Sequence, residues 1–174
     1  LSAIGDSEGV SERSLTRVSP HAQTITAVAD QLWEWAELGY LETQSSALLR
    51  HTLAEAGFEI STGIGDIPTA FTATFGSGAP VIGIMGEFDA LPGISQAAVP
   101  YAEAVEGKSS GHACGHNLFG AGSLGAALAV KDWLEASGQA GTVRFYGTPA
   151  EEGGSGKVYF CLLYTSPSPR DRIA

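Results

Sequence analysis

The sequence is poor in basic residues, in cysteine and in long apolar runs. Nine Lys and Arg residues stand against 19 Asp and Glu residues, which gives a formal net charge of −10. Such an acidic balance argues against nucleic acid or an anionic membrane as the partner. No apolar run reaches the length that crosses a bilayer, and residues 1–15 lack the apolar core of a signal peptide.

Only two cysteines occur, and Cys161 lies near the end of the chain. The body of the chain therefore has one thiol and no internal disulfide. This fits a reducing compartment, and we expect a cytoplasmic location. The chain opens on Leu1 rather than Met, so either its start is missing or a leader has been removed.

The sequence does contain enough apolar residues for one folded core, because 44% of its 174 residues are hydrophobic. Apolar residues at helical spacing predict helices over residues 20–38, 48–56 and 118–137, with Ser19 capping the first and Asn117 the third. Short apolar or alternating runs predict strands over residues 58–61, 69–75, 81–85 and 142–147. We expect an α/β fold in which helices flank a mixed sheet.

The run at residues 81–85 is continuously apolar, a pattern typical of a central strand covered on both faces. We therefore expect this strand to be buried in the middle of the sheet. Charged residues follow it directly, and open α/β sheets bind ligands at the carboxyl ends of their strands. The segment after this strand is thus a candidate part of a functional site.

One loop concentrates side chains that bind metals. Residues 111–117, Gly-His-Ala-Cys-Gly-His-Asn, place Cys114 and His116 two residues apart ahead of a helix, and Glu151 and Glu152 follow a later strand. Thiolate, imidazole and carboxylate are the ligands of zinc and similar ions. A lone Cys and His can also be ordinary core residues, and an acidic pair can be a solvated surface patch. The position of the acids directly after a strand favours a hydrolytic metal site.

Three ordered motifs resemble the metallo-amidohydrolases of the aminoacylase/carboxypeptidase type, peptidase family M20, and within them the aminobenzoyl-glutamate hydrolase branch. The motifs are Glu-Phe-Asp-Ala-Leu-Pro-Gly at 87–93, the loop at 111–117, and Gly-Thr-Pro-Ala-Glu-Glu-Gly-Gly at 147–154. The resemblance implies that residues 20–160 form the N-terminal, incomplete part of a zinc-peptidase-like catalytic domain. Many relatives carry Asp where Asn117 stands here.

The resemblance also implies a role for each matched side chain. It implies two divalent metal ions, zinc or manganese, with Cys114, His116 and Glu152 as ligands and Cys114 as a bridging thiolate. Glu151 matches the general base that takes a proton from a metal-activated water. The side chains that match ligand-orienting groups are Asp89 and His112. The implied reaction is hydrolysis of an amide bond in an N-acyl amino acid, aminobenzoyl-glutamate or a dipeptide.

After Phe160 the sequence departs from this family. Residues 161–174 resemble the translation of a sequencing-library adapter, and a natural Ser/Pro-rich linker is the alternative. We therefore divide the chain into a loose segment at 1–19, the catalytic-domain portion at 20–160 and a non-native tail at 161–174. The resemblance places further histidine ligands, later strands and an inserted dimerisation domain beyond Phe160. We expect this chain to be inactive by itself and to leave a sheet edge uncovered.

Two other classes of function stay open. The first is a cysteine hydrolase with Cys114 as nucleophile and a histidine as base, which leaves Glu151 and Glu152 without a role. The second is a non-catalytic binding module. For the complete parent protein, the resemblance implies a small amide or dipeptide substrate and a homodimer or hetero-oligomer formed through the inserted domain.

Overall fold

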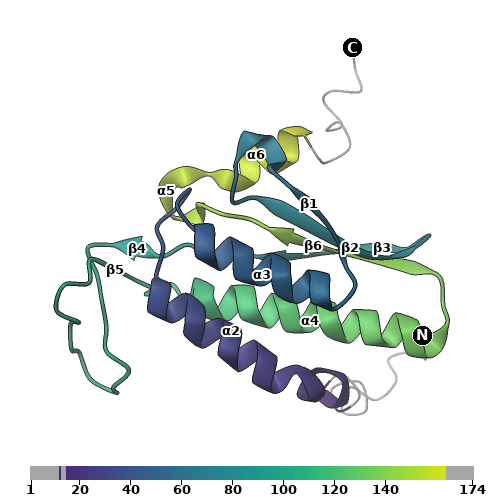
Figure 1. The fold of residues 1–174 in the computed structure, drawn as a ribbon, viewed down its shortest axis with the longest axis horizontal. Helices are drawn as coiled ribbons and strands as arrows, with labels where there is room; N and C mark the ends of the chain where they lie inside the picture. The colour runs from purple at the N-terminus through teal and green to yellow at the C-terminus, as the bar shows by residue number, and fades with distance from the viewer. Residues whose placement is uncertain (1–11, 13–14, 164–174) are drawn as a thin grey trace, which may run out of the picture.

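The computed structural model describes residue 12 and residues 15–163. A four-stranded mixed sheet has three helices on one side and a short helix on the other (Figure 1), so the expected α/β fold with flanking helices is confirmed. The elements, in chain order, are η1 Ser19–His21, α2 Ala22–Trp35, α3 Thr43–Glu55, β1 Glu59–Thr62, η2 Ile64–Asp66, β2 Phe71–Ser77, β3 Val81–Gly86, β4 Leu91–Pro92, β5 Ser110–Gly111, α4 His116–Ser137, β6 Gly141–Gly147, α5 Glu151–Gly154 and α6 Gly156–Leu163.

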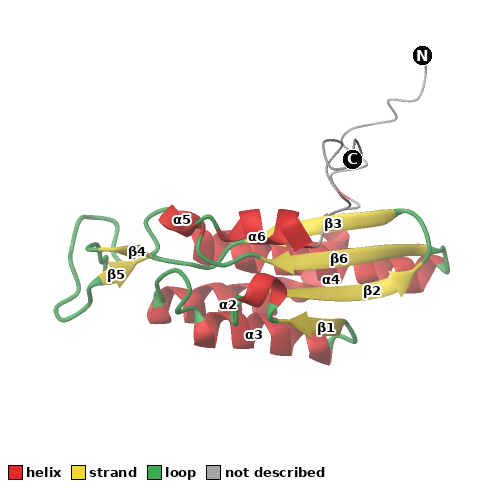
Figure 2. Ribbon diagram, turned by 90° about the horizontal axis from the view of Figure 1, so that it is seen from above, coloured by secondary structure: helices red, strands yellow, loops and turns green. Residues whose placement is uncertain are grey.

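The sheet has the strand order β1-β2-β6-β3. Strand β2 pairs antiparallel with both β1 and β6, whereas β3 pairs parallel with β6, with Val81 opposite Thr142. Figure 2 shows β6 between β2 and β3. Because β3 and β6 are parallel, the segments that follow them leave the sheet at the same end.

The expectation that residues 81–85 form the buried centre of the sheet is wrong. Strand β3 is the last strand of the four, and Val81, Ile82 and Met85 are 58%, 50% and 51% exposed. The inner positions belong to β2 and β6, and Val143 and Phe145 of β6 are fully buried. An apolar run shows that a strand can be covered on both faces, but it does not show which strands lie beside it. Among the described residues no strand lies beyond β3.

The core fills the space between the sheet and the layer of α2, α3 and α4. Each of these helices contributes a buried leucine, and the aromatic rings of β2 and β6 meet them from the sheet. The rings of Phe71 and Phe145 stack with their centroids 5.7 Å apart. The largest side chains of this core that are fully buried are Leu32, Leu49, Leu53, Phe71, Phe88, Leu124, Val143 and Phe145.

Small residues let α4 approach its neighbours closely. A Cβ atom at Gly120 would lie 2.7 Å from the carbonyl oxygen of Glu87, and one at Gly125 would lie 2.3 Å from Ile25. Gly120 therefore allows the first turns of α4 to rest against the segment after β3. This close packing brings the N-terminal residue of α4 to the carboxyl end of the sheet.

The helix ends differ from the expected caps. Ser19 is not an N-cap, since residues 15–18 are already helical and its hydroxyl donates to the Leu15 carbonyl. Helix α4 begins at His116 after Gly115, and the amide of Asn117 donates to the Ala29 carbonyl instead of capping the helix. Ser19 thus bonds to the preceding turn, and Asn117 bonds to the neighbouring helix α2. The rest of the loose segment expected at 1–19 lies outside the described residues, apart from residue 12.

The opposite face of the sheet is covered by α6, which packs on η2. Phe160 of α6 is buried with Ile64 and Ile67, and its ring meets that of Tyr146 edge-on at 6.2 Å. Helix α6 continues to Leu163, so it includes the first three residues of the expected tail, and residues 164–174 lie outside the described part. Within the described residues, no helix combines the length and the apolar character needed to cross a membrane.

Candidate metal centre

Three segments meet at the carboxyl end of β3 and β6. The first follows β3, the second follows β6 and contains α5, and the third is the start of α4. The backbone N–H and the hydroxyl of Thr148 both donate to the Gly86 carbonyl, at 3.0 and 3.3 Å, and tie the first two segments together. All six side chains that the sequence singled out lie on these three segments or on the loop that leads into α4.

His116 is the centre of this cluster. Its Nδ1 donates to the Asp89 carboxylate at 3.0 Å, and its Nε2 lies 2.9 Å from Glu87 Oε2. A proton held on Nδ1 by Asp89 leaves Nε2 as the nitrogen that can face a metal ion. The two acids after β6 also face Nε2, Glu151 at 3.9 Å and Glu152 at 4.0 Å.

Asp89 joins the segments by hydrogen bonds through both carboxylate oxygens. While Oδ1 accepts from His116, Oδ2 accepts from the backbone N–H of Glu152 at 2.8 Å. Asp89 is only 1% exposed. Its two hydrogen bonds tie the His116 ring to the backbone of Glu152.

Glu152 points an unpaired oxygen into the cluster. Its Oε1 is buried and has no hydrogen-bond partner among the described residues. A buried acceptor that lacks a donor is costly unless something else satisfies it. Glu151 is more exposed, and its carboxylate can reach both the cluster and solvent.

One group of side chains has the spacing that a metal ion requires. Ligand atoms of Glu87, His116 and Glu151 all lie within 4.8 Å of one another. The imidazole of His116 and the carboxylates of Glu87 and Glu152 are donors that fit a divalent ion such as zinc or manganese. Glu151 lies close enough to act on a water bound at the same place.

Cys114 lies at the rim of the same cluster. Its side chain is exposed, is not in a disulfide, and hydrogen-bonds to Glu152. This hydrogen bond and the negative charges of Glu152 and Glu151 raise the pKa of the Cys114 thiol. A nucleophilic cysteine needs the opposite shift, whereas a divalent cation at this place would deprotonate the thiol.

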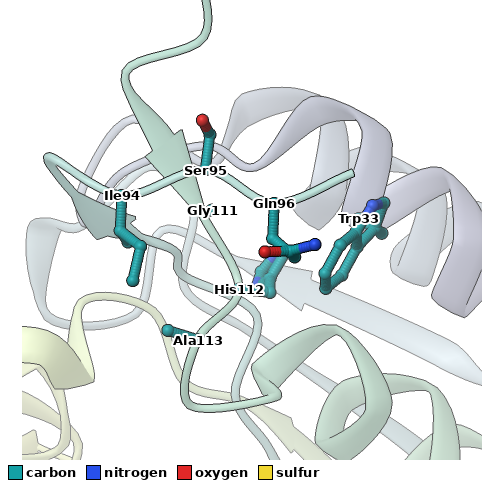
Figure 3. Close-up of a pocket in the computed structure, with 7 residues that line it drawn as sticks. All are labelled: Trp33, Ile94, Ser95, Gln96, Gly111, His112 and Ala113. Atoms are coloured by element: carbon teal, nitrogen blue, oxygen red, sulfur yellow. The ribbon is translucent and has the colours of Figure 1, made fainter. Parts of the chain in front are cut away.

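His112 contacts none of the expected metal ligands through a hydrogen bond. Its Nε2 donates to the Leu32 carbonyl at 3.1 Å, its Nδ1 is buried without a partner in the described structure, and burial lowers its pKa. The side chain lines a pocket of about 240 Å³ together with Trp33, Ile94, Ser95, Gln96, Gly111 and Ala113 (Figure 3). His112 therefore connects the loop at residues 111–117, hereafter the metal loop, to α2.

Glu87 and Lys157 were missed as site residues. One oxygen of Glu87 lies 2.9 Å from Nε2 of His116, and the other forms an ion pair with the ammonium of Lys157 on α6. The signal available for Glu87 was its place two residues before Asp89, at the end of an apolar strand. Lys157 had no comparable signal, since only the fold brings α6 over this end of the sheet.

Comparison with known proteins agrees with this fold and this cluster. The chain superposes on a dinuclear metal-binding peptidase of the M20 family from Bacillus subtilis with a TM-score of 0.70 and 28% identity, covering 83% of this chain and 39% of that one. It is 50% identical over 138 residues to a subunit of the p-aminobenzoyl-glutamate hydrolase of Escherichia coli, covering 79% of this chain and 29% of the relative. It is 30% identical over 170 residues to the Xaa-Arg dipeptidase of Mus musculus, covering 90% of this chain and 36% of the relative.

The mixed sheet, its helical layer and the cluster at its carboxyl end thus define a domain of the metallopeptidase class. Residues 83–166 match the pattern of "Peptidase family M20/M25/M40", and the chain belongs to this family. The chain spans about a third of the length of the curated relatives that it matches.

Proposed function

We propose that the protein to which these residues belong hydrolyses an amide bond by means of a metal-activated water. The main support is the meeting of His116, Glu151 and Glu152 at one point, with a buried Glu152 oxygen that has no donor in the described part of the chain. A buried carboxylate oxygen without a donor costs stability, and a bound cation would satisfy it.

Two divalent ions are part of the proposal, with Cys114, His116 and Glu152 as ligands and Glu87 within reach of the same site. Such ions polarise the scissile carbonyl and lower the pKa of water. The likeness to the Bacillus subtilis peptidase, which is named for its dinuclear metal binding, supports two ions. Zinc and manganese both suit the mixture of thiolate, imidazole and carboxylate.

The protein's own residues divide the remaining work. Glu151 holds and moves the proton: its carboxylate takes it from the attacking water and hands it to the departing amine. Asp89 keeps the His116 ring in one orientation and fixes the backbone of Glu152 at the same time. His112 keeps the metal loop against the Leu32 carbonyl of α2.

The substrate class follows from the names of the relatives. These include a p-aminobenzoyl-glutamate hydrolase, a dipeptidase and, in Bacillus subtilis, an N-acetylcysteine deacetylase that is 34% identical. We propose an N-acyl amino acid, aminobenzoyl-glutamate or a dipeptide as the substrate and the cytoplasm as the location. The Escherichia coli relative is named as one subunit of its hydrolase, which supports an oligomeric parent protein, whether homodimer or hetero-oligomer.

A chimera tests this function. Residues 20–160 replace the aligned segment of the Escherichia coli relative, and hydrolysis of aminobenzoyl-glutamate, N-acetylcysteine and dipeptides is measured with zinc or manganese. Glu151→Gln should lower kcat by at least about 10²-fold without loss of bound metal, because it removes the base and not a ligand. Glu59→Gln, a matched change on β1, should leave kcat unchanged.

The same chimera decides against the cysteine alternative. Excess chelator should abolish turnover of the unmodified chimera. Full activity in chelator, together with inactivation by iodoacetamide, would instead identify Cys114 as a nucleophile. The raised pKa of its thiol already disfavours that role.

A further inference from the structure

The loop between α2 and α3, residues 36–42, contacts two of the segments that form the cluster. On one side, the N–H of Ala90 donates to the Glu37 carbonyl at 2.8 Å, next to the bridge between Leu38 and Ala90. On the other side, the Tyr40 hydroxyl donates to the Gly154 carbonyl. This loop has no role in the proposed reaction, although it lies between the segments that carry the reacting side chains.

Glu42, the last residue of this loop, is fully buried. Its Oε1 accepts from the backbone N–H of Ala150 at 2.8 Å, and its Oε2 accepts from the Thr69 hydroxyl at 3.0 Å. In the described part of the chain, no Lys, Arg or His forms an ion pair with it, and burial raises its pKa. A buried carboxylate without a cation costs stability, so the packing of the core does not explain it.

The partner of Glu42 is the residue that aims the two acids. Ala150 has φ 55°, a left-handed conformation that is rare for a residue with a Cβ atom. It directly precedes Glu151 and Glu152, and the short helix α5 that follows has non-helical torsions at Glu152 and Gly153. The turn therefore depends on bonds from outside it for its shape.

Three such bonds come from elsewhere in the chain. Glu42 binds the N–H of Ala150, Asp89 binds the N–H of Glu152, and Tyr40 binds the carbonyl of Gly154. The hydrogen bond from Glu42 holds Ala150, the residue with the left-handed φ that directly precedes both acids. Releasing it frees Ala150 to return to a common conformation, which would rotate Glu151 and Glu152 relative to His116.

We propose that Glu42 is a positioning residue, whose buried carboxylate holds the Ala150 turn so that Glu151 and Glu152 face His116. What the two acids do there rests on the proposed function, but the holding of the turn does not. Glu42 itself touches neither substrate nor metal.

Hydrogen exchange of the 174-residue chain without metal tests the holding of the turn. Glu42→Met fills a similar volume without an acceptor and removes a buried charge, so the protein should remain folded. Exchange of the Ala150 amide should become about tenfold faster, the effect of losing one charge-assisted hydrogen bond, while Phe145 and Leu124 stay protected. Glu42→Gln keeps an acceptor for Ala150 and should exchange within about threefold of the original chain.

Glu37→Ala is the matched control, because it removes another carboxylate from the same loop. Glu37 accepts from the N–H groups of Gln44 and Ser45 and caps α3, with no side-chain bond to the Ala150 turn. Its loss should speed exchange at the start of α3 and not at Ala150. Unchanged exchange at Ala150 in Glu42→Met, or equal acceleration in Glu42→Gln or Glu37→Ala, would overturn the proposal.

A cobalt titration measures the consequence for the cluster. The affinity for Co²⁺, followed by its visible absorption, should fall about tenfold in Glu42→Met and stay near the original value in Glu42→Gln. Equal affinity in the original chain and Glu42→Met would overturn the positioning role. If the original chain binds no Co²⁺, the proposed function fails in this chain, and the exchange result alone decides whether Glu42 holds the turn.

Discussion

Strand β3 and the segment that follows it reverse the usual relation between polarity and burial. The apolar side chains of Val81, Ile82 and Met85 are at least half exposed, whereas Glu87 is 8% and Asp89 1% exposed. Apolar residues are normally buried and acids almost never are, unless they are paired. Within a dozen residues, this chain does the opposite.

The difference is one of partners. Asp89 has the His116 ring and the N–H of Glu152, and Glu87 has His116 and the Lys157 ammonium. The open side of β3 has no neighbouring strand in the described part of the chain. Burial at this end of the sheet is thus maintained by hydrogen bonds and ion pairs, which makes it sensitive to substitutions that leave hydropathy almost unchanged.

Asp89→Ala should produce the largest loss of stability in this comparison. The substitution leaves the N–H of Glu152 without its acceptor, and the buried His116 Nδ1–H keeps only the backbone carbonyl of residue 89 at 3.1 Å. We expect the free energy of unfolding of the metal-free chain to fall by about 3 kcal/mol, even though one negative charge leaves an acidic cluster. Urea denaturation followed by circular dichroism measures it.

Glu151→Ala is the control for that experiment. Glu151 is an acid of the same cluster, but it is more exposed and no hydrogen bond to its carboxylate is recorded among the described residues. Its removal should change the free energy of unfolding by no more than about 0.5 kcal/mol. Equal losses for the two variants would mean that hydrogen bonding does not maintain the burial of Asp89.

The sequence predicted the components of this region better than their surroundings. Helices, strands and the order of the three motifs follow from local patterns. The structure brings side chains from these motifs together around His116, namely Asp89, Glu151 and Glu152. The position of β3 at an edge could not be predicted in this way, since an apolar run does not reveal which strand lies beside it. Glu42 and Lys157 were equally inaccessible, because their partners, Ala150 and Glu87, are 108 and 70 residues away along the chain (150 − 42 and 157 − 87).

The pH dependence of stability at His112 is a second, smaller test of how polar side chains are buried at the carboxyl end of the sheet. Burial lowers its pKa below the ordinary value of 6.5, so the unfolded chain binds a proton more readily than the folded chain. The resulting stabilisation is present above pH 6.5 and is lost as the pH falls from there through the folded-state pKa. We expect the original chain to lose stability relative to His112→Gln, which does not titrate, between about pH 7.5 and about pH 5.5.

Urea denaturation at several pH values measures this loss. His51→Gln changes an exposed histidine on α3 and is the matched control. It should leave the pH dependence of the original chain in place. A His112→Gln variant with the same pH dependence as the original chain would show that this ring does not carry the predicted linkage.

The smallest effect on stability is expected at the other end of the comparison, on β3 itself. Met85 lies two residues after Gly83 and so points to the same face of the sheet, the face that carries Tyr146. Half of its surface is exposed, so Met85→Lys should change the free energy of unfolding by no more than about 0.5 kcal/mol. The same substitution places a charge on an apolar edge strand, and charged edges resist pairing with another chain. Sedimentation velocity at rising concentration should therefore show less self-association for Met85→Lys than for the original chain.

Leu41→Lys, an apolar-to-lysine change at a 66% exposed position outside the sheet, should not have this effect. A large loss of stability in Met85→Lys would show that the strand is buried after all, and equal association of both variants would show that the exposed edge is not what brings copies together.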